Sequence, residues 1–127
     1  MIQIGTYVHG GGNLEEKIAT IKKAGFDFVA IGMGALSDGT LEYQVELCRK
    51  YGLEIDNIHL TGAKTTEIWF DAELGDEVCE RYCREIKMAA AAGIKKGVAH
   101  ITWGHKDPGE VSKCGIDRLT RMADCAQ

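Results

Sequence analysis

The sequence repeats one local pattern three times: the end of an amphipathic helix, a glycine, an apolar residue, and then a β-rich segment. A glycine at the end of a helix can take the left-handed conformation that stops the helix, because it has no Cβ to clash. Each copy therefore predicts a helix that ends and leads directly into a strand. The glycine and the apolar residue are Gly25-Phe26, Gly52-Leu53 and Gly93-Ile94.

The helices before these glycines can be located from their caps and from apolar residues three and four positions apart. Asn13 is placed to cap the first helix, with Glu16 three residues later as its capping-box partner. The second helix is expected to begin near Thr40, the third near Asp76 and a fourth near Ile116.

Four β-rich segments fill the gaps between these helices. We expect strands at about residues 2–8, 27–31, 54–60 and 97–103. Strands that alternate with helices form parallel sheets, because a tight hairpin joins only antiparallel strands. The predicted fold class is therefore α/β, with four βα units in one domain that spans residues 1–127.

Four βα units are compatible with a small open sheet or with half of a (β/α)8 TIM barrel, which typically takes about 250 residues. Half a barrel cannot close on itself. Residues 123–127 resemble a helix that stops before its glycine and the next strand. We favour a parallel (βα)4 half of a TIM barrel. It would be completed by a C-terminal half or by self-association into a homo-oligomer.

Composition limits the kinds of partner and the cellular location that we expect for this protein. The net charge of −4 argues against a nucleic-acid binder, which needs clustered Lys and Arg. There is no apolar run of about 18 residues to cross a membrane, and no secretory signal is visible, so we expect a cytoplasmic protein. The five cysteines include no Cys-x-x-Cys pair, which favours reduced thiols.

Three segments carry a family resemblance. Residues 51–59 (YGLEIDNIH) resemble the third strand of the xylose isomerase-like TIM barrels, and residues 91–100 (AAGIKKGVAH) resemble the fourth. Residues 22–29 (KKAGFDFV) resemble the first helix running into the second strand. This superfamily includes sugar phosphate isomerases and epimerases, ketose 3-epimerases and endonuclease IV-type DNA repair enzymes. The resemblance implies the N-terminal half of such a barrel.

The resemblance also implies chemistry. In the epimerase branch a divalent metal (Mn, Mg, Co or Zn) is held by Glu, Asp, His and Glu on the last four strands. Carboxylates there move a proton at the carbon next to the substrate carbonyl. No residue of this sequence matches those ligands, so we assign neither metal ligands nor catalytic residues. The second predicted strand also lacks a Glu that relatives often carry at its end.

Parallel barrels place their function at the carboxyl ends of the strands. The residues there that we predict to bind substrate are Tyr7, His9, His59, His100 and Trp103. For each histidine the alternative is a hydrogen-bonded structural role. Tyr7 and Trp103 are placed either as aromatic walls of a sugar pocket or as fillers of the barrel mouth.

Three functions remain open at this point. The chain is half of a metal-dependent sugar or sugar phosphate isomerase or epimerase, a non-enzymatic half-barrel that self-associates, or a fragment of an endonuclease IV-type nuclease. In that nuclease branch, histidines at the positions of His59 and His100 ligate zinc; the acidic charge favours a substrate pocket instead. Residues 69–71 (WFD) are either a lid over the pocket or a separately packed cluster.

Overall fold

The computed structural model describes residues 2–34, 40–102 and 109–127 of the chain. Within those residues it has four strands, four α-helices and a 3-10 helix of five residues. In chain order these are β1 (Gly5–Tyr7), α1 (Leu14–Lys23), β2 (Phe28–Gly32), α2 (Leu41–Lys50), β3 (Glu54–His59), the 3-10 helix η2 (Thr65–Trp69), α3 (Glu73–Ala91), β4 (Gly97–Val98) and α4 (Lys113–Asp124).

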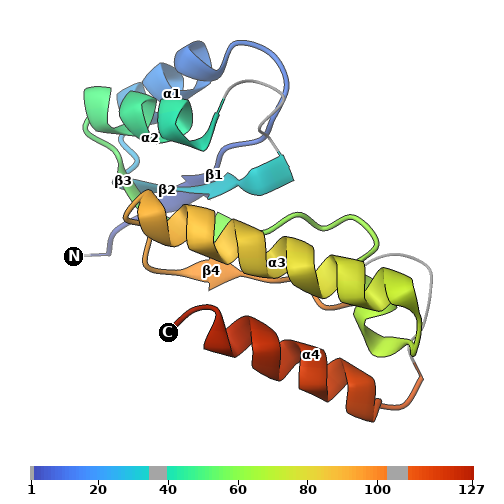
Figure 1. Ribbon diagram of the computed structural model, residues 1–127. Coiled ribbons are helices and arrows are strands. Elements are labelled where there is room, and N and C mark those ends of the chain that lie inside the picture. Colours follow the sequence, from blue (N-terminus) through green and yellow to red (C-terminus); the bar gives the residue numbers. More distant parts are fainter. Residues whose placement is uncertain (1, 35–39, 103–108) are drawn as a thin grey trace.

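The four strands form one sheet in the order β1-β2-β3-β4, and every neighbouring pair is parallel. The register places Tyr7 beside Ala30, and Gly32 beside His59. Sequential, parallel strands with a helix in each crossover confirm the predicted α/β class and the half-barrel topology. Figure 1 shows α1 beside α2 at one end of the sheet, and α3 beside α4 at the end where β4 lies.

The repeated glycines end their helices as predicted. Gly25, Gly52 and Gly93 have φ angles of 88°, 63° and 81°, which lie in the left-handed region. The predicted cap of the first helix is also confirmed, since the Asn13 side chain accepts a hydrogen bond from the backbone of the third helical residue of α1. The second helix begins next to Thr40, as expected, and Thr40 caps α2 in the same way.

Other boundaries differ from the prediction. Helix α4 begins at Lys113, because the Ser112 hydroxyl accepts a hydrogen bond from the Gly115 backbone at 3.1 Å. Helix α3 begins at Glu73 rather than near Asp76; its first turn lies ahead of the apolar stripe that we used to locate it. Strands β1 and β4 are shorter than expected, since each is an edge strand with a single neighbour.

The two faces of the sheet differ in what covers them. Val29, Ile31 and Ile58 are fully buried in the core together with residues of the helices, such as Ile18 and Tyr82. The opposite face, which we call the uncovered face, presents half-buried side chains that do not belong to this core. Its residues are Tyr7, Phe28, Ala30, Asn57 and His59.

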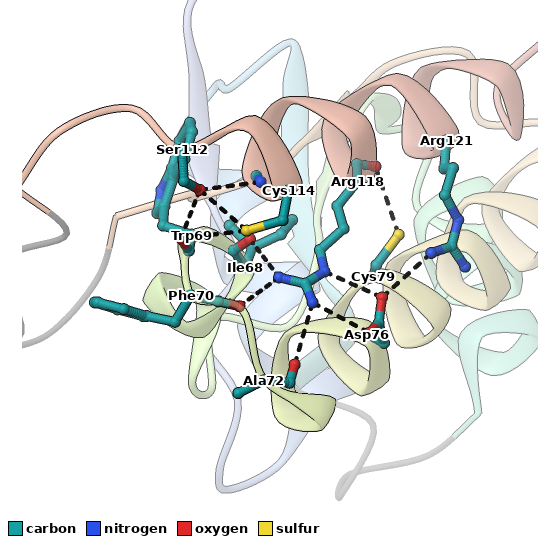
Figure 2. A network of polar contacts seen from close by, with 11 residues as sticks. Ile68, Trp69, Phe70, Ala72, Asp76, Cys79, Ser112, Cys114, Arg118 and Arg121 are labelled. Carbon is teal, nitrogen blue, oxygen red and sulfur yellow. Dashed lines mark hydrogen bonds and ion pairs between the residues drawn. The ribbon is translucent and has the colours of Figure 1, made fainter.

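The segment after β3 packs into the same hydrophobic core as the sheet, rather than as the lid or the separate cluster that we considered: Ile68 and Trp69 belong to that core and Phe70 packs against it. Trp69 is buried, and its indole N–H donates to the carbonyl of Ile101 at 2.8 Å. The Ser112 hydroxyl donates to the Trp69 carbonyl at 2.5 Å, which joins η2 to the start of α4 (Figure 2). A Cβ on Gly115 would overlap the indole, so the two elements approach closely only because residue 115 is glycine.

Within the described part of the chain, no helix combines the length and the apolar character needed to cross a membrane.

The cysteines at 79 and 83 lie on one face of α3, as the spacing of four predicts, and both face α4. Cys79 is fully buried and donates to the carbonyl of Arg118, and Cys83 donates to that of Arg121.

Candidate functional site

A cavity of about 900 Å³ opens at the carboxyl ends of the strands. Four of the five residues that we predicted to bind substrate line it, from three strand ends that are far apart in sequence. The lining residues are Tyr7, His9, Gly34, His59, Leu60, Thr61, Gly62, Ala63, Lys64 and His100. The fifth predicted residue, Trp103, lies outside the described residues.

Tyr7 reaches across the uncovered face from β1 to β2. A Cβ on Gly32 would overlap the Tyr7 hydroxyl, so the absence of a side chain at position 32 makes room for the phenol. The Tyr7 ring lies 4.9 Å from the His59 ring, centroid to centroid, at a tilt of 59°. The tyrosine therefore forms a wall of the cavity beside the histidine at the end of β3.

His59 and His100 form a direct pair. The Nδ1 atom of His59 lies 3.1 Å from the Nε2 atom of His100, so one ring donates and the other accepts. The Tyr82 hydroxyl donates to the His100 carbonyl at 3.1 Å, which ties this segment after β4 to α3. Burial, and to a lesser degree the neighbouring His100, lowers the pKa of His59 below its usual 6.5.

His9 lies at the exposed rim of the cavity. Its ring meets the Tyr7 ring nearly edge-on, at 78° with the centroids 4.9 Å apart. The Lys17 ammonium of α1 donates to the backbone carbonyls of His9 and Gly10, at 2.9 and 3.2 Å. The loop after β1 is thus fixed by a side chain of the helix that follows it.

The wall formed by residues 60–64 was missed by sequence reasoning. These five residues follow β3 directly and supply half of the cavity lining; we call them the β3 loop. Lys64 is a non-glycine residue in the left-handed region, with φ of 56°. The only sequence signal is the Thr-Gly-Ala run immediately after a predicted strand end, which marks a loop but identifies no ligand contact.

The described residues do not build the metal site that the family resemblance implies. Among residues 2–34, 40–102 and 109–127 there is no group of three or more His, Cys, Asp or Glu side chains able to hold a metal ion. The His59–His100 pair contributes two nitrogen atoms and has no carboxylate among the described cavity residues. The cavity therefore offers hydrogen-bonding groups and an aromatic wall.

The fold matches solved structures of ketose 3-epimerases over about half of their length. A D-allulose 3-epimerase from Methylomonas sp. is 21% identical with a TM-score of 0.71, and a D-psicose 3-epimerase from Clostridium cellulolyticum H10, crystallised with D-tagatose, is 12% identical with a TM-score of 0.73. A D-psicose 3-epimerase studied in the presence of D-fructose is 14% identical with a TM-score of 0.72. Each match covers 98% of this chain and 48% of the other.

These matches define the class: a parallel (βα)4 unit with the fold of half a TIM barrel. The particular barrels are sugar epimerases, which confirms at the level of the fold the resemblance seen in the sequence. No protein-family model matches the chain, and no curated protein sequence matches it.

Proposed function

We propose that this chain provides one half of a sugar isomerase or epimerase barrel and binds a small sugar or sugar phosphate at the carboxyl ends of its strands. One observation carries the proposal: Tyr7, His59 and His100, from three different strand ends, converge on one cavity in a fold shared with ketose 3-epimerases. Active sites of TIM barrels lie at this end of the sheet.

The chemistry of these side chains suits a polyol. The Tyr7 ring gives an apolar surface for the C–H face of a sugar, as aromatic walls do in many sugar sites. The His59–His100 pair holds each ring in one orientation, so each can exchange a hydrogen bond with a sugar hydroxyl through its second nitrogen. These residues bind and orient the substrate; none is assigned a proton-transfer role.

Isomerisation or epimerisation next to a carbonyl requires groups that remove and return a proton. In the proposal these carboxylates, and the divalent metal of the family (Mn, Mg, Co or Zn), belong to the other half of the barrel. That half is a C-terminal segment or a second copy of the chain. The uncovered face, with its apolar Phe28 and Ala30 outside the core, supports such a completion.

The proposal also includes the absence of a nucleic-acid partner and the cellular compartment. The acidic charge opposes a nucleic-acid partner, and the five free thiols fit a reducing compartment such as the cytoplasm.

The test measures association state and sugar binding on the same sample. Light scattering at micromolar concentration gives the mass, and titration with D-fructose, D-tagatose and D-allulose, followed by NMR, gives binding. We expect Tyr7→Ala and His59→Asn to weaken binding at least tenfold. Tyr43→Phe, which changes an exposed tyrosine of α2, should leave it unchanged. If neither these ketoses nor D-fructose 6-phosphate, titrated in the same way, binds saturably, the proposal is refuted.

Turnover separates the alternatives. Ketose conversion with Mn²⁺, Co²⁺ or Mg²⁺ that EDTA abolishes identifies an enzyme. Sugar binding by an assembled oligomer without turnover identifies a non-enzymatic half-barrel. Bound zinc together with binding to an abasic duplex at low salt identifies the nuclease and overturns the sugar proposal.

A further inference from the structure

The β3 loop is held from behind by two side chains of α3. Glu85, a residue that is only 8% exposed, accepts the Thr61 backbone N–H through its carboxylate at 2.8 Å. The Arg81 guanidinium donates to the carbonyls of Thr61 and Ala63, at 3.1 and 2.7 Å. Glu85 and Arg81 lie one helical turn apart and face each other at 4.0 Å.

In this arrangement two charged side chains of α3 bind backbone groups of the loop. A buried charge such as that of Glu85 is costly unless hydrogen bonds compensate it, and the Thr61 N–H supplies one. Arg81 is partly exposed and binds the loop carbonyls through its Nη2 atom. We call Arg81 and Glu85 the α3 clamp. The α3 clamp binds both the N–H and the C=O of Thr61, three residues before Lys64, whose φ angle lies in the left-handed region. The loop thus has a defined backbone path along one wall of the cavity.

The charge of the cavity wall points to a type of ligand. In a protein of net charge −4, the described residues that line the cavity include no Asp or Glu. Lys64 is the one Lys or Arg among them. Its ammonium has no ion-pair partner among the described residues. The Glu85 carboxylate, which contacts this wall from behind, is engaged by the Thr61 backbone N–H.

We propose that Lys64 binds a negatively charged group of the ligand, a phosphate or a carboxylate on a sugar, and that Arg81 and Glu85 are positioning residues that hold the β3 loop for this contact. The proposal rests on the proposed function, because it assigns the charge of the sugar that the cavity takes. It gives the α3 clamp a role in ligand selection in addition to folding.

Three probes that share one carbon skeleton test the contact: D-fructose, D-fructose 6-phosphate and D-fructuronate, titrated into the full chain by calorimetry. We expect wild type to bind at least one anionic probe tenfold or more tightly than D-fructose. Lys64→Gln should remove that preference, lowering the affinity for the anionic probe to about that for D-fructose. Lys95→Gln, an exposed lysine at the opposite end of the sheet, is the matched control. The two anionic probes distinguish phosphate from carboxylate recognition.

Failures of the two proposals differ. Wild type that binds D-fructose as tightly as both anionic probes overturns the inference alone, as does an unchanged preference in Lys64→Gln. Wild type that binds none of the three probes overturns the proposed function and the inference with it.

The positioning role is tested on α3. Glu85→Ala should lose the anion preference and speed hydrogen exchange of the Thr61 amide at least tenfold. Glu85→Gln keeps an oxygen that accepts this N–H and should restore both. Arg81→Met should reduce the preference, whereas Glu80→Ala and Arg84→Met, which alter exposed residues of the same helix, should not. A preference that survives both Glu85→Ala and Arg81→Met overturns the positioning role, even if the variants melt at a lower temperature.

Discussion

Replacement of Arg118 by Met tests how α4 is held to the rest of the molecule. Arg118 lies on α4, is 4% exposed, and has five hydrogen bonds for its five N–H groups. Three go to the backbone carbonyls of Ile68, Phe70 and Ala72, at 3.0, 2.6 and 3.1 Å. Two go to the Asp76 carboxylate, each at 3.1 Å (Figure 2). One side chain therefore connects η2, the start of α3 and α4.

The size of the effect follows from these contacts. Methionine keeps most of the aliphatic stem, so the cost comes from lost hydrogen bonds rather than from a cavity. Three backbone carbonyls lose their charged donor, at about 1 kcal/mol each, which gives about 3 kcal/mol. Asp76 is half exposed and stays solvated, so it adds nothing to this sum. For a chain of this length, a loss of about 3 kcal/mol lowers the melting temperature by roughly 10 °C.

Thermal and urea denaturation followed by circular dichroism measure this loss. Arg121→Met is the matched control, because Arg121 touches the same carboxylate at 3.3 Å but is itself half exposed. We expect the control to shift the melting temperature by no more than about 2 °C. If Arg118→Met melts within that same margin of wild type, the carbonyl contacts do not stabilise the fold and the reasoning fails.

Three further predictions concern single residues. Gly32→Ala places a methyl group where the Tyr7 hydroxyl lies, so it should shift the Tyr7 ring resonances and weaken ketose binding at least tenfold; Gly97→Ala, whose methyl would meet nothing within 4 Å, should do neither. His59 should titrate by NMR with a midpoint below 6.5, because burial disfavours its charged form. The unfolded chain takes up this proton at a higher pH than the folded chain does, so the stability that neutral His59 gives the fold is lost as the pH falls below 6.5 toward the folded pKa. A titration midpoint above 6.5 would contradict the lowered pKa. Cys48 is fully buried, and burial raises its pKa from 9.0 to about 11. Iodoacetamide at pH 8 should therefore label it at least about a hundredfold more slowly in native protein than in urea, and equal rates would contradict the burial.

Local chemistry made much of the fold predictable. Asn13 and Thr40 cap their helices through a contact only three residues away, so the sequence contains all the information needed. The left-handed conformation of Gly52 is also predictable from local sequence, because a helix end favours a residue without a Cβ at that position. Because strands and helices alternate, the parallel order of the sheet follows from connectivity.

The site was predictable only in part, because it combines local and distant information. His59 and His100 are 41 residues apart, yet both mark strand ends, and parallel strands bring their ends to one edge. Their hydrogen bond and the close approach of the Tyr7 hydroxyl to Gly32 depend on register and side-chain direction, which no local pattern specifies.

The contacts that α3 and α4 make with the segment after β3 could not be predicted from the sequence. Arg118 looks like any surface arginine of an amphipathic helix, and only the packing of α4 on η2 buries it. Glu85 and Arg81 form an ordinary (i, i+4) pair, typical of a solvated helix face. Their partners are backbone groups of a loop about 20 residues earlier, and backbone groups carry no sequence signature.

The types of side chain that line the cavity suit sugar binding rather than proton transfer. The described lining supplies an aromatic wall, a histidine pair and a lysine, all suited to hold a sugar, but no carboxylate to move a proton. A barrel assembled from this half would thus take its substrate-binding groups from one side and its proton-transfer groups from the other. Sugar affinity and turnover should then respond to different halves: changes at Tyr7 or Lys64 act on the dissociation constant first. In the proposal, this division follows from the fold, because the uncovered face that would hold the ligand is also the face that a second half would cover.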